Sequence, residues 1–293
     1  MSYGFFMRLI LIITWLVSVC AMAGEKLPQK VTFIGKAKFD AVVQKAQKGN
    51  WAKLPIGQRM AKIGLELEGI PYKGFTLEIH DKVESPSVNF KGLDCWTFFE
   101  TTMGIARMLE TPKANYTPSD LLKEIEHTRY RGGVCNGNYL DRIHYLAEWY
   151  KDNHKRKTIY DITKTFPTVE MKNTCDEMSK LWKYYRYLNK NPHLRPLMAK
   201  QEREMTAMRV FMVPKSKVAG IEKHLRNGDI IGIARNDGGS YCSHVGMIVI
   251  DQNKKARFMH ASSTHKKVLV DSTISEYLKK YKKHAGILIA RPR

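Results

Sequence analysis

Cys95 is the first residue of this sequence whose type and setting could support catalysis. It follows Asp94 in the stretch GLDCWTFFETTMGIARML, residues 92–109, in which apolar residues recur at helical spacing. Asp94 is of a residue type that caps helices, so Cys95 is expected in the first helical turn. The free backbone N–H groups and the helix dipole stabilise a thiolate there. Position alone also fits a disulfide half or a buried, inert cysteine, so the assignment depends on what else reaches this thiol.

Two histidines lie on a predicted hairpin near the C-terminus. In SHVGMIVIDQNKKARFMHASS, residues 243–263, His244 opens one strand and His260 closes the next. With an odd number of loop residues, the even-numbered positions of both strands share one face, and the histidines become cross-strand neighbours. With an even number they fall on opposite faces, and the sequence does not fix this register. On one face they would form a general base and its orienting partner. Cys242 is expected to share the face of His244.

Zinc binding is an alternative use of Cys95, His244 and His260. The chain has no C-x-x-C pair and no other metal-ligand spacing. We therefore expect no metal and no cofactor.

The elements that must position these residues change character along the chain. Residues 31–70, 117–130 and 139–153 have helical periodicity, and Ser119 or Thr117 caps the second of these segments. The last third instead contains short apolar runs between turn residues: DIIGIA, HVGMIVI, ARFMHAS, KVLVD and GILIAR. These runs predict an antiparallel sheet of about five strands. Helices first and a sheet last indicate an α+β fold.

The segment 151–215 is long, basic and aromatic. We expect it to be a helical and irregular insertion that lies over the core. Residues 24–293 are therefore predicted to form a single domain that contains this insertion.

The first 23 residues resemble a secretory signal peptide. Arg8 precedes an apolar run from Leu9 to Val19, and Ala21-Met22-Ala23 matches the A-x-A pattern of a signal-peptide cleavage site. The run is short for a stable membrane span, although a membrane anchor is the alternative interpretation. We expect cleavage after Ala23, loss of Cys20, and a periplasmic or secreted protein. In such a compartment a disulfide between Cys135 and Cys175 is possible, and the sequence leaves it open.

The formal net charge of +21 concerns partners rather than fold. For an exported protein, anionic polymers of the cell envelope are the expected partners. No zinc finger, RNP signature or basic heptad region is present, so nucleic acid is not expected.

Five anchors along residues 69–263 resemble the NlpC/P60 class of papain-like cell-wall hydrolases. In order they are GIPYKGFTLE, GLDCWTFFE, GDIIGIA, SHVGMIV and FMHASS. Together with RYRGG and DRIHYLAEWY, the chain is most similar to the DUF1460 branch of N-acetylmuramoyl-L-alanine amidase-like proteins. Trp96 departs from the small residue that usually follows the cysteine, and the separation of Cys95 from His244 is wider than in compact members.

The resemblance implies a role for each anchor residue. Cys95 would be the nucleophile, His244 the general base and His260 the residue that orients it. Tyr72 would help to stabilise the oxyanion.

Substrate contacts are expected from Arg131 and Arg142, since guanidinium groups bind the carboxylates of a muropeptide, and from Ser243 and Asp94 beside the site. The implied activity is that of an exported cysteine amidohydrolase acting on peptidoglycan or muropeptides, most simply an N-acetylmuramoyl-L-alanine amidase. The alternatives are a stem-peptide endopeptidase and a non-catalytic, basic envelope-binding protein.

Overall fold

The computed structural model describes residues 26–293. The predicted signal peptide, residues 1–23, lies outside this range. Among the described residues, no helix is both long and apolar enough to cross a bilayer.

The N-terminal half is helical, as its periodicity predicts. Its helices are α1 (Gln29–Thr32), α2 (Lys36–Lys48), α3 (Ile56–Glu66), α4 (Cys95–Met108), α5 (Pro118–Arg129) and α6 (Leu146–Lys155). Two short parallel strands, β1 (Phe33–Ile34) and β2 (Val88–Asn89), join the start of this layer to the loop before α4. The cap of α5 is Thr117, whose side chain and that of Asp120 bond each other's backbone N–H groups.

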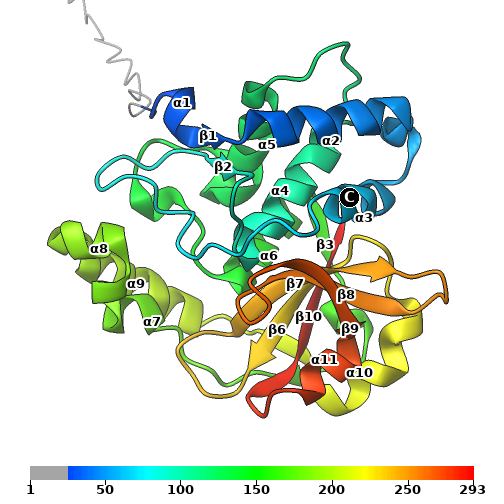
Figure 1. The fold of residues 1–293 in the computed structure, drawn as a ribbon. Helices are drawn as coiled ribbons and strands as arrows, with labels where there is room; N and C mark the ends of the chain where they lie inside the picture. The colour runs from blue at the N-terminus through cyan, green and yellow to red at the C-terminus, as the bar shows by residue number, and fades with distance from the viewer. Residues whose placement is uncertain (1–25) are drawn as a thin grey trace, which may run out of the picture.

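The C-terminal third forms the predicted antiparallel strands. They are β6 (Ile230–Arg235), β7 (Cys242–Ile250), β8 (Ala256–Ser262), β9 (Lys267–Thr273) and β10 (His284–Pro292). From one edge of the sheet to the other, the neighbouring strands are β4-β5-β10-β6-β7-β8-β9, and β3 also pairs with β10. The α+β architecture is thus confirmed, with the helices above the sheet in Figure 1.

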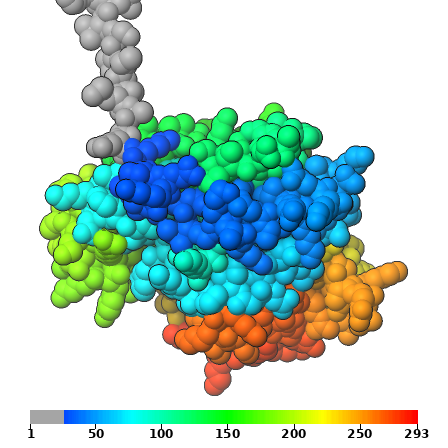
Figure 2. Space-filling view, turned by 45° about the horizontal axis from the view of Figure 1, so that its top comes forward, coloured from blue at the N-terminus to red at the C-terminus, as the bar shows by residue number. Residues whose placement is uncertain are grey.

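The insertion is more regular than expected, because it widens the sheet to eight strands. It supplies β3 (Ile159–Asp161), β4 (Val169–Glu170) and β5 (Phe211–Pro214), which are two to four residues long. Its helices are α7 (Glu177–Lys180), α8 (Arg186–Lys190) and α9 (Arg195–Thr206), which gather at one side of the molecule (Figure 1). In the space-filling view this segment flanks the face that the N-terminal helices cover (Figure 2).

Short 3-10 helices connect several elements, at Trp51–Lys53, Arg131–Gly133, Tyr139–Asp141, Thr163–Thr165, Trp182–Tyr184, Pro192–Leu194 and Glu222–His224.

The sheet is covered on both faces. On one face Val245, Met247 and Met259 pack into the core that includes α4. On the other face Ile248 and Phe258 pack with α10 (Lys215–Ile221) and α11 (Ile274–Lys279). Alternate residues of β7 and β8 therefore pack into different cores. This fixes the strand register, because a slip of one residue would move every side chain to the other core.

The cysteines 95, 135, 175 and 242 are all free thiols. The disulfide left open for Cys135 and Cys175 is therefore absent, and the buried thiols contribute to packing as small apolar groups.

Candidate active site

Cys95 is the first residue of α4, as predicted. The carboxylate of Asp94 accepts the Thr97 N–H at 2.7 Å, and the Thr97 hydroxyl accepts the Asp94 N–H at 3.0 Å. The Thr76 hydroxyl donates to the other oxygen of Asp94 at 2.8 Å. Asp94 borders the cavity described below, but both of its oxygens already accept hydrogen bonds that fix the start of the helix. The geometry thus shows its capping role, whereas its expected contact with substrate stays a prediction.

The two histidines share one face of the sheet. Ile250 pairs with Ala256, so the connection between β7 and β8 comprises residues 251–255, an odd number. The ring nitrogens Nε2 of His244 and Nδ1 of His260 are 2.7 Å apart. The condition that the sequence could not decide is therefore met, and His260 is placed to orient His244.

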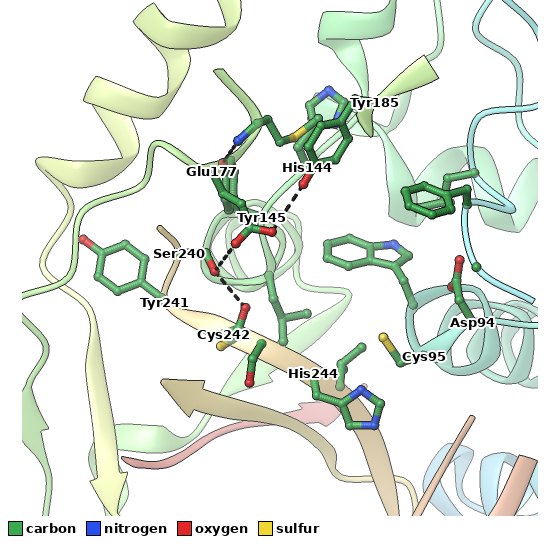
Figure 3. Close-up of a pocket in the computed structure, with 18 of the residues that line it drawn as sticks. Asp94, Cys95, His144, Tyr145, Glu177, Tyr185, Ser240, Tyr241, Cys242 and His244 are labelled. Carbon is green, nitrogen blue, oxygen red and sulfur yellow. Dashed lines mark hydrogen bonds between the residues drawn. The ribbon is translucent and has the colours of Figure 1, made fainter. Parts of the chain in front are cut away.

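The thiol and one histidine of the pair share a cavity. Cys95 of α4 and His244 of β7 both line it (Figure 3). Since Nε2 of His244 is bonded to His260, Nδ1 is the ring nitrogen that remains for the thiol. The backbone N–H groups near the sulfur, that of Val245 foremost, lower the pKa of Cys95 but do not outweigh its burial.

Burial dominates the protonation of these groups. Burial, reinforced by the charge of Asp94, raises the pKa of Cys95 to about 12 despite the helix N-terminus. Burial and the neighbouring His260 hold the pKa of His244 well below its usual range, and burial lowers the pKa of His260 to about 4. Burial therefore favours a neutral thiol and two neutral imidazoles at neutral pH, and so acts against the thiolate that the helix N-terminus favours.

Tyr72 lies beside the thiol as the motif implies. Its N–H donates to the carbonyl of Lys266 at 2.8 Å, and the next residue donates to the carbonyl of Leu93 at 3.0 Å. Burial, with the nearby Cys95, raises the pKa of Tyr72 to about 12, so the phenol keeps its proton. It is available as a hydrogen-bond donor toward the cavity that it lines.

The cavity has a volume of about 400 Å³. The insertion forms part of its wall through Glu177, Met178 and Tyr185, rather than through its many basic residues. Trp96 also lines the cavity and packs on Phe99, with ring centroids 5.7 Å apart. The bulky residue after Cys95 is therefore accommodated as part of the cavity wall.

The two predicted substrate-binding arginines differ in position. Arg142 lines the cavity, is 4% exposed, and lies 3.2 Å from Glu84 and 3.5 Å from Glu78. Arg131 does not line it: its guanidinium binds Glu148 at 2.7 Å and the carbonyl of Arg142 at 3.0 Å. Arg131 braces the chain behind Arg142, so its position gives no support to a direct substrate contact.

A bulge in β7 separates Ser243 and Cys242 from His244. Ile233 pairs with His244 while Ala234 pairs with Cys242, so the register shifts at Ser243. Cys242 therefore packs against the α4 core, and the expectation that it shares the face of His244 was wrong. Ser243 is exposed and lines the cavity, whereas its expected contact with substrate stays a prediction.

The sequence reasoning missed Asp271 on β9. Its Oδ2 lies 3.5 Å from Nε2 of His260. Asp271 is two residues beyond Leu269, which pairs with His260, so strand alternation could have indicated it. Within residues 26–293, no three His, Cys, Asp or Glu side chains are grouped to hold a metal ion.

Solved structures of other proteins share the fold of this chain. An N-acetylmuramoyl-L-alanine amidase from Bacteroides uniformis shares 30% identity, with 81% of this chain and 99% of that chain covered and a TM-score of 0.72. A Bacteroides fragilis protein provisionally named a xylanase also shares 30% identity, over 78% and 98% of the chains, with a TM-score of 0.70.

A Legionella pneumophila protein of the DUF1460 family is 18% identical over 88% and 94% of the chains, with a TM-score of 0.63, and so shares the fold. No curated protein matches. Residues 62–287 match the AmiA-like family model, described as N-acetylmuramoyl-L-alanine amidase-like. Because this match spans more than half of the chain, the protein belongs to the AmiA-like family.

Proposed function

We propose that this protein is an exported cysteine hydrolase that cleaves an amide bond in peptidoglycan or its fragments. The observation that carries the proposal is the 2.7 Å contact between His244 and His260, beside a cavity that His244 lines together with Cys95. A nucleophile, a base and a residue that orients the base are the parts that covalent amide hydrolysis requires.

The reaction begins with a proton transfer that is coupled to attack. Because the resting thiol and imidazole are neutral, His244 takes the Cys95 proton on Nδ1 as the sulfur attacks the amide carbonyl. The tetrahedral oxyanion accepts a hydrogen bond from the Tyr72 hydroxyl. Donors of this kind contribute about 3–4 kcal/mol each to catalysis.

The intermediate then collapses to an acyl-enzyme. The C–N bond breaks, and the amine leaves with the proton that His244 held. His244 next takes a proton from water, whose oxygen attacks the thioester. The second tetrahedral intermediate collapses to release the carboxylic acid, and the proton returns from His244 to the sulfur of Cys95.

The bond between the lactyl group of N-acetylmuramic acid and L-alanine is the favoured target. This choice is supported by the family and by the name of the Bacteroides uniformis relative. The acyl group would be the muramoyl lactyl carbonyl, and the leaving amine would be that of L-alanine. The net charge of +21 favours attraction to anionic envelope polymers.

Glycoside hydrolysis is not favoured by the site, although one relative's name suggests it. That chemistry uses two free carboxyl groups that flank the substrate. The carboxylates lining this cavity are already engaged: Asp94 by Thr97 and Thr76, Glu78 by Tyr139 and Tyr187, and Glu177 by Arg235.

The test is mass spectrometry of defined substrates incubated with residues 24–293. A free peptide that begins with L-alanine, released from N-acetylmuramoyl-peptide, supports the amidase. Shortened peptides still attached to sugar would instead identify an endopeptidase. If the protein retains intact sacculi but cleaves neither substrate, the envelope-binding alternative replaces the enzyme.

Export is tested separately. We expect the protein expressed with its own N-terminus to be recovered outside the cytoplasm and to begin at Gly24. A cytoplasmic protein that keeps residues 1–23 would contradict the proposed localisation.

A further inference from the structure

We propose that Asp271 is a positioning residue that sets the tautomers of His260 and His244, and so leaves a lone pair on His244 for the Cys95 thiol. The inference rests on the function proposed above for Cys95 and His244. It extends the site by one carboxylate that touches neither the thiol nor the substrate cavity.

Asp271 is held with one oxygen toward His260. Its Oδ1 accepts the Lys280 ammonium and the Ser272 N–H, each at 2.6 Å. Its Oδ2 faces Nε2 of His260 at 3.5 Å. The Asp271 side chain is 9% exposed and that of His260 is 2% exposed, so little water reaches the space between them.

The carboxylate is ionised in this position. Burial alone would raise the pKa of Asp271, but the Lys280 ammonium and the Ser272 N–H outweigh it and hold the pKa well below its usual range. A negative charge therefore faces the outer nitrogen of His260 at neutral pH.

This charge selects which nitrogen of His260 carries the proton. Nε2 is buried and has no hydrogen-bond partner among the described residues. The distance of 3.5 Å is longer than a good hydrogen bond, yet the electrostatic preference does not depend on ideal geometry. A lone pair facing the carboxylate is repelled, whereas an N–H is attracted. Neutral His260 therefore carries its proton on Nε2 and presents a lone pair on Nδ1.

The tautomer of His260 determines that of His244 through the 2.7 Å contact between the rings. Since Nδ1 of His260 is an acceptor, Nε2 of His244 must carry the donor proton. Neutral His244 then has its lone pair on Nδ1, the nitrogen that remains for Cys95. With the opposite tautomers, Nδ1 of His244 would already be protonated and could not accept the thiol proton.

Aromatic packing keeps solvent from reversing this choice. The ring of Phe258 stacks on His260 with centroids 4.8 Å apart, and Tyr277 lies edge-on to His260 at 5.2 Å. With water excluded, the carboxylate is the group that distinguishes the two tautomers of His260.

The test compares Asp271→Asn with Asp271→Ala. In the Asn variant, Lys280 and the Ser272 N–H retain the amide oxygen, so the amide NH₂ faces His260 and favours the inverted tautomers. We expect kcat to fall about 10²-fold or more, as when a carboxylate behind a catalytic histidine becomes an amide. Asp271→Ala removes the preference for a proton on Nε2 of His260 without inverting it, so kcat should fall less than in Asp271→Asn. A purely structural role predicts the reverse order, because Asn preserves the shape of the side chain.

Nitrogen NMR of histidine-labelled protein provides a readout that needs no substrate. His244→Gln and His260→Gln assign the signals, and Lys279→Met, at an exposed residue of α11 beside Lys280, controls for changes at the surface. We expect protonated Nε2 on both rings in the wild type and in Lys279→Met, and protonated Nδ1 in Asp271→Asn. Protonated Nδ1 in the wild type, or unchanged tautomers in Asp271→Asn, would overturn the inference. Since the spectra are independent of turnover, they decide it even if no muropeptide is cleaved.

Discussion

Nε2 of His244 and Nδ1 of His260 are 2.7 Å apart, and His244 lines the same cavity as Cys95. Cys95 is the first residue of α4, and His244 belongs to β7. The thiol and the imidazole are therefore held by a helix and a strand rather than by loops, which favours a fixed arrangement of the proposed nucleophile and base.

The pKa of Cys95 predicts a distinctive alkylation profile. Because burial holds the thiol neutral, its reaction with iodoacetamide should be slow at pH 7 and should still increase with pH above 9. Peptide-resolved mass spectrometry measures each site, and Cys175, whose pKa is also about 12 but which lies outside the cavity, is the comparison. A Cys95 rate that reaches its plateau below pH 8 would show a preformed thiolate and contradict coupled proton transfer.

Tyr72→Phe should lower kcat by about 10²–10³-fold while KM changes little, because the hydroxyl acts on the oxyanion. The phenyl ring keeps the packing of the tyrosine, so the folded structure should be preserved. Tyr185→Phe is the matched control, since this cavity tyrosine already donates to Glu177 at 3.3 Å. Equal losses in the two variants would remove Tyr72 from the oxyanion site.

Stability should fall in mildly acidic solution. Burial lowers the pKa of His260 and of His127 to about 4, and that of His244 well below its usual range. A lowered folded-state pKa gives stability that is present above the unfolded value of about 6.5 and is lost as the pH falls toward 4. Each histidine should contribute up to about 1.4 kcal/mol for each pH unit in this window.

Denaturant melts at pH 7, 6 and 5 measure this effect. His127→Gln is the informative variant because His127 lies outside the cavity. In this variant the free energy of unfolding should fall less between pH 7 and pH 5, by the contribution of one histidine. A free energy of unfolding that stays constant from pH 7 to 5 would contradict neutral burial of these rings.

The two arginines should respond differently to substitution. Arg142→Gln leaves Glu84 and Glu78 buried without their cation, so it should cost about 3–5 kcal/mol of stability and should raise KM. Arg131→Gln breaks a pair with the partly exposed Glu148 and should cost less. If Arg131→Gln raises KM as much as Arg142→Gln, Arg131 has a role in binding that its position does not suggest.

Local pattern accounts for most of what the sequence predicted. Asp94 and Thr97 form a cap within one turn, and the hairpin that carries His244 and His260 is continuous in the chain. The short strands β3 and β5 could not be recognised, because they are defined by pairing with the distant β10 rather than by their own periodicity. Strand alternation places Asp271 on the face of His260 only once the β8–β9 register is known, and this register shifts between Arg257 and Met259. The sequence around Ser243 does not indicate a bulge. The bulge places Cys242 on the opposite face of the sheet from the one predicted.

Cleavage of N-acetylmuramoyl-peptide by Cys95→Ala and Cys242→Ala decides whether Cys95 is the nucleophile. Both thiols line the cavity, but Cys242 packs into the α4 core on the opposite face from His244. We expect Cys95→Ala to abolish release of the peptide and Cys242→Ala to keep kcat/KM close to that of the wild type. Full activity in Cys95→Ala would contradict this assignment.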